Sequence, residues 1–134
     1  MTPPRDAPAP GSAHDWLRHA ESDLQFARLG RADVGVLRNQ PAFHAQQAAE
    51  KAIKAVLLHH QARFPKTHDL EVLIELLALA RIPWPFTTPE VEALTPYAVE
   101  LRYPGGFADV SQTELDEAIA SAETVLTWAK AIVK

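Results

Sequence analysis

Residues 43–55 read FHAQQAAEKAIKA, and this stretch decides the class of fold. At 100° per residue, its small and apolar side chains fall on one broad helix face that continues one turn further, at Ala45, Ala48, Ala49, Ala52, Ile53 and Val56. Because alanine dominates the first half of that face, a neighbouring helix can approach it closely. The pattern predicts a long helix with Pro41 in its first turn and an end near Ala62.

Two further stretches carry helix-start residues. Ser12-Ala13-His14-Asp15 resembles a capping box with Asp in place of Glu, and the helix after it is expected to run to Gly30. Ser111-Gln112-Thr113-Glu114 is a complete capping box. Apolar residues then recur at helical spacing, at Leu115, Ala118, Ile119, Ala122, Val125, Leu126, Ala129 and Ile132. A first and a last helix are therefore predicted.

Prolines set the expected bounds in the middle of the chain. A third helix is predicted from residues 67–68 until Pro83 and Pro85 end it. A fourth is expected to begin at a cap at residues 87–88, and Pro96 must kink it or divide it in two.

No segment shows sustained alternation of apolar and polar residues. The prediction is an all-α fold, an up-and-down four-helix bundle with an additional short helix. Residues 12–134 form one helical domain in this prediction, and residues 1–11, with four prolines, form a disordered tail.

Composition excludes several classes of function. The chain has 134 residues and no cysteine, so a thiolate nucleophile and a Cys-ligated metal are excluded. There is no HExxH, Gly-rich phosphate loop or Gly-x-Ser-x-Gly, and the adjacent His59 and His60 point about 100° apart on a helix. No metal and no cofactor are expected. The sequence has no run of 18 apolar residues, so no membrane span is predicted. We expect a cytoplasmic protein.

Charge is distributed unevenly along the chain. The formal net charge is -4. Residues 38–68 nevertheless hold five lysines and arginines against one acid, Glu50, whereas residues 69–100 are strongly acidic. The balance disfavours a protein that coats nucleic acid but allows one local anionic site.

That basic stretch places four polar residues within about 80° of one another on the predicted helix, at His44, Gln47, Lys51 and Lys54. Two ammonium groups, an amide and an imidazole on one ridge can bind a phosphate and a base edge. The alternative is a solvated face on which Glu50 pairs with Lys54 at i,i+4.

Arg102 marks a second candidate site, at the break before the last helix. It lies among Tyr97, Tyr103 and Phe107, so the guanidinium can hold a phosphate while a ring stacks on a base. The alternative is that Arg102 anchors the loop by pairing with Glu100 or with helix-end carbonyls.

These stretches together resemble the HEPN family, the nucleotide-binding domains of prokaryotes and higher eukaryotes. Residues 43–55 resemble its second-helix signature. Residues 64–70, FPKTHDL, and residues 97–105, YAVELRYPG, match two further blocks in the same order. The likeness covers residues 14–133.

The resemblance implies a commonly dimeric helical bundle that often acts with a minimal nucleotidyltransferase in toxin–antitoxin pairs. It also implies, for many members, metal-independent endoribonuclease activity from an arginine followed by a histidine in a late helix. No histidine follows Arg102. Arg38 with His44, and Arg63 with His68, have that spacing in earlier parts of the chain. Histidine would act as general base on a ribose hydroxyl and arginine would stabilise the phosphorane.

Three hypotheses follow. The first is a binding module for a nucleotide or RNA, partnered by a nucleotidyltransferase, that uses His44, Gln47, Lys51, Lys54, Tyr97, Arg102 and Tyr103. The second is a ribonuclease toxin with Arg38 and His44 as the catalytic pair. The third is a structural dimerisation module. Because the alanine-rich face and the apolar stripe of residues 115–132 exceed what a small bundle needs, we expect a homodimer.

Overall fold

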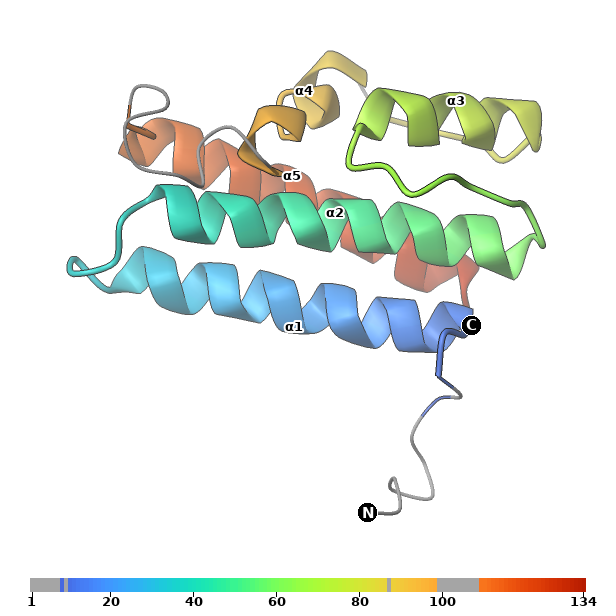
Figure 1. Cartoon of the computed structure of the whole chain (residues 1–134), viewed down its shortest axis with the longest axis horizontal. Helices are drawn as coiled ribbons and strands as arrows, with labels where there is room; N and C mark the ends of the chain where they lie inside the picture. The colour runs from blue at the N-terminus through green and yellow to red at the C-terminus, as the bar shows by residue number, and fades with distance from the viewer. Residues whose placement is uncertain (1–7, 9, 87, 99–108) are drawn as a thin grey trace.

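The computed structural model describes residues 8, 10–86, 88–98 and 109–134. They form α1 (Ala13–Ala32), α2 (Asn39–His59), α3 (Leu70–Leu79), α4 (Thr88–Glu92) and α5 (Gln112–Ile132), with a 3₁₀ helix, η1 (Thr95–Ala98), after α4. No strand occurs within these described residues (Figure 1). The prediction of an all-α bundle with an additional short helix is confirmed.

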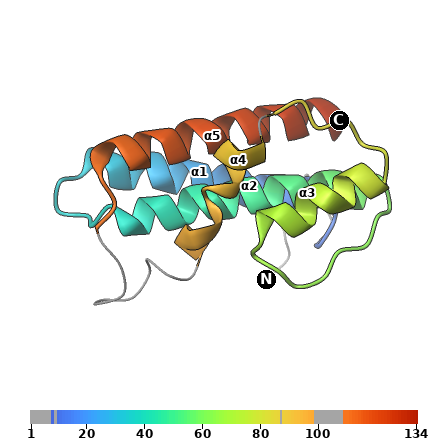
Figure 2. The ribbon, with the colours of Figure 1, turned by 90° about the horizontal axis from the view of Figure 1, so that it is seen from above.

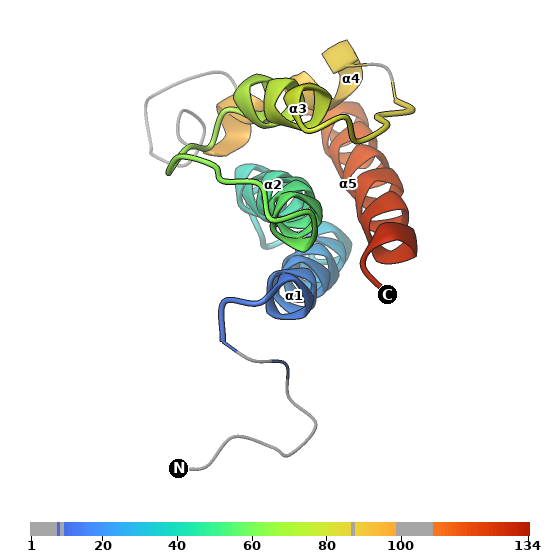
Figure 3. The same ribbon diagram turned by 90° about the vertical axis from the view of Figure 1, so that its right-hand side faces the viewer.

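α2 is the central helix of the bundle. Seen end-on, it lies between α1 on one side and α3 on the other, and α5 runs alongside (Figure 3). From above, α3 and α4 lie in front of the other helices (Figure 2), and Figure 1 shows them on the side of α2 away from α1. The alanines predicted to face a neighbour are fully buried, as are Ala20 and Ala27 of α1. Small side chains on both helices therefore bring α1 and α2 close together.

Both predicted capping sequences begin a helix. Ser111 Oγ accepts from the backbone N–H of Glu114 at 3.0 Å, and the Glu114 carboxylate accepts from the backbone N–H of Ser111 at 2.9 Å. The hydrogen bond from the Ser111 backbone N–H to the carboxylate, followed by the Ser111 hydroxyl, lowers the pKa of Glu114. At α1, Ser12 Oγ accepts from Asp15 N–H, but the Asp15 carboxylate accepts from Gly11 N–H instead of closing the box on Ser12.

α2 and α3 end earlier than the sequence predicts. Gln61 and Arg81 both take φ of 59°, the left-handed conformation that favours glycine. Beyond them, Ala62 N–H donates to the Leu57 carbonyl and Ile82 N–H to the Leu77 carbonyl, each at 2.9 Å. Both helices therefore end in Schellman motifs, and α3 ends before Pro83 and Pro85, which were expected to stop it.

The helix predicted around Pro96 is divided in two. α4 ends at Glu92, and Pro96 lies inside η1. Val91, Leu94 and Ala98 are buried. The prediction of a disordered tail concerns residues that lie largely outside the described part of the chain.

Candidate functional site

The ridge predicted on α2 is divided between two carboxylates. His44 and Lys51 contact Asp23 of α1, whereas Lys54 contacts Glu50 of α2 itself. The amide of Gln47 donates to Gln46 Oε1 at 2.7 Å. The four residues therefore share one side of the helix without forming one continuous basic surface.

The first group, which we call the Asp23 cluster, consists of Asp23, His44 and Lys51. Lys51 Nζ lies 2.6 Å from Asp23 Oδ2, and His44 Nδ1 lies 3.0 Å from Asp23 Oδ1. The His44 ring lies between Phe26 and Phe43, with ring centroids 4.4 and 5.2 Å away. The side chains of His44 and Lys51 remain 25% and 24% exposed, so a ligand can reach both.

The second group, the Glu50 cluster, consists of Glu50, Lys54, His68 and Gln46. Glu50 Oε2 lies 3.0 Å from Lys54 Nζ, and Glu50 Oε1 lies 2.7 Å from His68 Nδ1 and 3.1 Å from Gln46 Nε2. The side chains of Glu50 and Lys54 are 3% and 7% exposed. The alternative interpretation of a Glu50–Lys54 pair is thus seen, but the pair is buried and not solvated.

The Glu50 cluster holds the connection between α2 and α3. Lys54 Nζ donates to the Thr67 carbonyl at 3.0 Å, and Gln46 Nε2 donates to the His68 carbonyl at 3.3 Å. Asp69 follows at once and caps α3 through its hydrogen bond with Glu71 N–H. Residues 43–55 and 64–70, which were matched separately by sequence, therefore meet in one buried polar cluster.

Tyr97 lies in different surroundings. It lines a hollow between α4, η1 and α5 together with Glu90, Glu114 and Glu117. Burial, followed by the charges of Glu114 and Glu117, raises the pKa of the Tyr97 phenol. Three carboxylates oppose an anionic ligand in this hollow. The other two predicted binding residues of this region, Arg102 and Tyr103, lie outside the described residues.

The two arginine–histidine pairs have unlike environments. Arg38 lies before α2 and lines a hollow with Asp109 and Gln112 at the start of α5, whereas His44 contacts α1. His68 is held by Glu50 in the α2–α3 connection, and Arg63 is exposed. The spacing in sequence thus does not direct Arg38 and His44 to one hollow.

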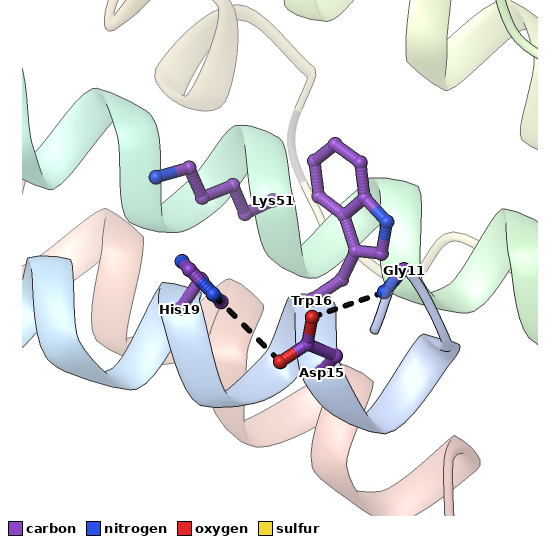
Figure 4. A pocket seen from close by; sticks show the side chains of 5 residues that line it. All are labelled: Gly11, Asp15, Trp16, His19 and Lys51. Carbon is purple, nitrogen blue, oxygen red and sulfur yellow. Dashed lines mark hydrogen bonds and ion pairs between the residues drawn. The ribbon is translucent and has the colours of Figure 1, made fainter. Parts of the chain in front are cut away.

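A pocket of about 250 Å³ lies beside the Asp23 cluster, lined by Gly11, Asp15, Trp16, His19 and Lys51. In Figure 4, Trp16 and His19 lie on opposite sides of it, and the Lys51 ammonium points away from Trp16. Neither Trp16 nor His19 was predicted from the sequence as a binding residue. The available signal was their i,i+3 spacing on α1, which places both on one face.

The described part of the chain shows neither a metal site nor a membrane-spanning helix. Its His, Asp and Glu residues form no group arranged to hold a metal ion. No helix within it combines the length and the apolar content needed to cross a membrane.

The fold and the site define a small helical-bundle domain whose central helix presents paired polar side chains beside a pocket. The family model described as the HEPN domain matches residues 13–132. The chain therefore belongs to the HEPN family.

Two solved structures are similar along nearly their whole length. TT1696 from Thermus thermophilus is 27% identical with a TM-score of 0.68, over 90% of this chain and 97% of that one. ST0689, an archaeal HEPN homologue, is 25% identical with a TM-score of 0.61, over 92% and 98%. No curated protein matches the chain.

Proposed function

We propose that this HEPN domain binds a nucleotide or an RNA segment and acts with a minimal nucleotidyltransferase in a toxin–antitoxin-like pair. The observation that carries the binding proposal is the Asp23 cluster. One carboxylate holds an ammonium and an imidazole side by side, both are partly exposed, and Phe26 and Phe43 flank the imidazole. In nucleic-acid-binding sites, cationic side chains bind the phosphate and neighbouring aromatic rings stack on the base.

Within this proposal the residues of the ridge have unequal roles. Lys51 contacts the phosphate and exchanges its Asp23 partner for the ligand, with His44 as a second donor. Lys54 does not contact the ligand in this proposal but stabilises the α2–α3 connection, because its ammonium is buried against Glu50 and the Thr67 carbonyl. Arg102 and Tyr103 remain predicted contacts from the segment before α5. Lys51 alone contributes a shallow salt dependence to RNA binding, in which the logarithm of the binding constant falls against the logarithm of salt concentration with a slope of about −0.7.

Lys51→Gln tests the site. Fluorescence anisotropy of a labelled nucleotide and a labelled RNA oligomer is expected to show binding weakened roughly fivefold, which corresponds to about 1 kcal/mol. Lys130→Gln is the matched control, because Lys130 is also an exposed lysine that pairs with a carboxylate of α1, Glu21. Equal affinity in wild type and Lys51→Gln would exclude this site.

The partners need separate measurements. A small nucleotidyltransferase encoded in the adjacent reading frame, and its co-purification with this chain, would support the toxin–antitoxin assignment. Light scattering at tens of micromolar is expected to give the mass of a homodimer. A monomer mass would contradict the dimer.

A metal-independent ribonuclease is the second candidate. The observation in its favour is the contact of Asp23 with His44 Nδ1, because a neutral ring that donates from Nδ1 has Nε2 as a proton acceptor. RNA cleavage in EDTA that His44→Ala abolishes would establish it. Intact RNA across a broad set of substrates, with and without the partner, would exclude it.

A further inference from the structure

The pocket beside Lys51 has the size and lining of a subsite for one flat ring. Its volume of about 250 Å³ falls just below the roughly 300–1,000 Å³ of sites that enclose a whole ligand of drug size. Trp16 supplies an aromatic wall and the Lys51 side chain crosses the α2 side (Figure 4). A ligand that fits this space places a ring inside and its remaining groups outside.

Trp16 is held firmly for such a role. The Phe64 ring packs edge-on against its indole at a centroid distance of 5.8 Å, and Lys54 Nζ lies 5.6 Å from the indole centroid. Neither Phe64 nor Lys54 lines the pocket, so the pocket meets indole surface that both leave uncovered. A fixed aromatic surface loses little conformational entropy when a base stacks on it.

The rim of the pocket carries polar groups that can read a base edge. Asp15 accepts hydrogen bonds from Gly11 N–H and Arg18, and these, in that order, hold the pKa of Asp15 below its usual range. The carboxylate is therefore an acceptor only. His19 is mostly exposed and lies 3.7 Å from Asp15. An acceptor at the rim can accept from the exocyclic amino group of adenine, whereas uracil offers only its N3–H, which lies between two carbonyl oxygens that the carboxylate repels.

We propose that this pocket is a nucleobase subsite in which an amino-bearing base stacks on Trp16 and directs its phosphate to Lys51. The inference rests on the proposed nucleotide or RNA binding. It adds the positions of the base and the phosphate within the site. The Lys51 ammonium points away from Trp16, so phosphate and base occupy separate ends of the site (Figure 4). The same chemistry serves a free nucleotide and a nucleotide within an RNA strand.

Calorimetry on the full chain with AMP, UMP, ribose 5-phosphate, oligo(A) and oligo(U) tests the subsite. In the wild type, AMP is expected to bind at least roughly fivefold tighter than ribose 5-phosphate, the low end of base–aromatic stacking. AMP is also expected to bind more tightly than UMP. In Trp16→Leu, the affinity for AMP falls to that for ribose 5-phosphate, which is itself unchanged.

Two further variants keep the test independent of folding, because Trp16 also packs against the core. Asp15→Asn keeps the shape of the side chain but adds an amide donor that suits a uracil carbonyl, so the preference for AMP over UMP is expected to fall toward one. His14→Ala is the matched control, since His14 is exposed on the same helix and does not line the pocket. It is expected to leave all affinities unchanged.

The outcomes separate the two proposals. If oligo(A) binds but AMP does not, and Trp16→Leu weakens the binding of oligo(A), the subsite belongs to RNA. If AMP binds, the subsite is assigned to a free nucleotide. Lys51-dependent binding in which AMP equals ribose 5-phosphate, and oligo(A) equals oligo(U), overturns the base subsite and leaves the proposed function standing. Absence of binding by every probe overturns both.

Discussion

The Asp23 and Glu50 clusters contain the same kinds of side chain but differ in their exposure to solvent. Each joins one carboxylate to a lysine of α2 and to the Nδ1 of a histidine. In the Asp23 cluster all three side chains remain partly open to solvent. In the Glu50 cluster the carboxylate and the lysine are buried, and the histidine alone is exposed, at 57%. One face of α2 thus contributes to both the solvent-accessible Asp23 cluster and the Glu50 cluster, whose buried pair stabilises the α2–α3 connection.

The neighbouring elements cause the difference. Lys51 and Lys54 are three residues apart on α2, so the helix presents both in nearly the same direction. The α2–α3 connection covers Lys54 and offers it the Thr67 carbonyl. Lys51 has a partner on α1 and remains beside the pocket. Availability for a ligand is therefore decided by tertiary cover and not by the pattern of charges along the helix.

Lys54→Met is expected to give the largest effect, because it leaves the buried Glu50 carboxylate without its cation. Loss of one partner of a buried pair costs about 3–5 kcal/mol of unfolding free energy. Urea unfolding followed by circular dichroism measures the loss.

Glu50→Gln combined with Lys54→Met is the control for this prediction. The double variant is expected to be more stable than the sum of the single changes implies, because the unpaired charge is gone. Strict additivity would show that the two side chains do not act as a pair.

Asp23→Asn tests the exposed cluster and is expected to cost less, about 1 kcal/mol of unfolding free energy, because solvent screens both of its pairs. It also frees the Lys51 ammonium. Nucleotide affinity measured by anisotropy is therefore expected to rise by a few fold under the proposed function. Weaker binding in this variant would indicate that Asp23 positions Lys51 for the ligand instead of competing with it.

Gln61→Gly tests the connection that the Glu50 cluster holds. Gln61 has φ of 59°, which costs an ordinary residue about 1 kcal/mol. Glycine removes this cost but loses more entropy on folding, so the expected gain in unfolding free energy is below about 1 kcal/mol. The change is measured by thermal unfolding, and Gln40→Gly, in the first turn of α2, should destabilise the protein.

The parts of the fold that follow from local chemistry were predictable. The alanine face of α2, the Ser111 capping box and the division at Pro96 depend on residues close together in sequence. The ends at Gln61 and Arg81 were missed, because glycine normally marks a left-handed helix end and neither position has it.

The site was predictable in part. The Glu50–Lys54 pair is a local i,i+4 contact, and the sequence indicated it. The Asp23–Lys51 pair joins residues 28 positions apart, so no local pattern identifies the partner. The role of Trp16 depends on Phe64 and on the path of the α2–α3 connection. Periodicity assigns such a residue to a helix face but not to a pocket.

The close contact between the alanine faces of α1 and α2 has a consequence for the order of assembly. These helices are joined by a short turn, so their contacts are local and form at a small loss of chain entropy. α5 closes the core much later in the sequence, with buried residues such as Ala122 and Val125. During synthesis the α1–α2 hairpin can therefore form first, but the apolar surface that awaits α5 stays uncovered until the last helix has emerged.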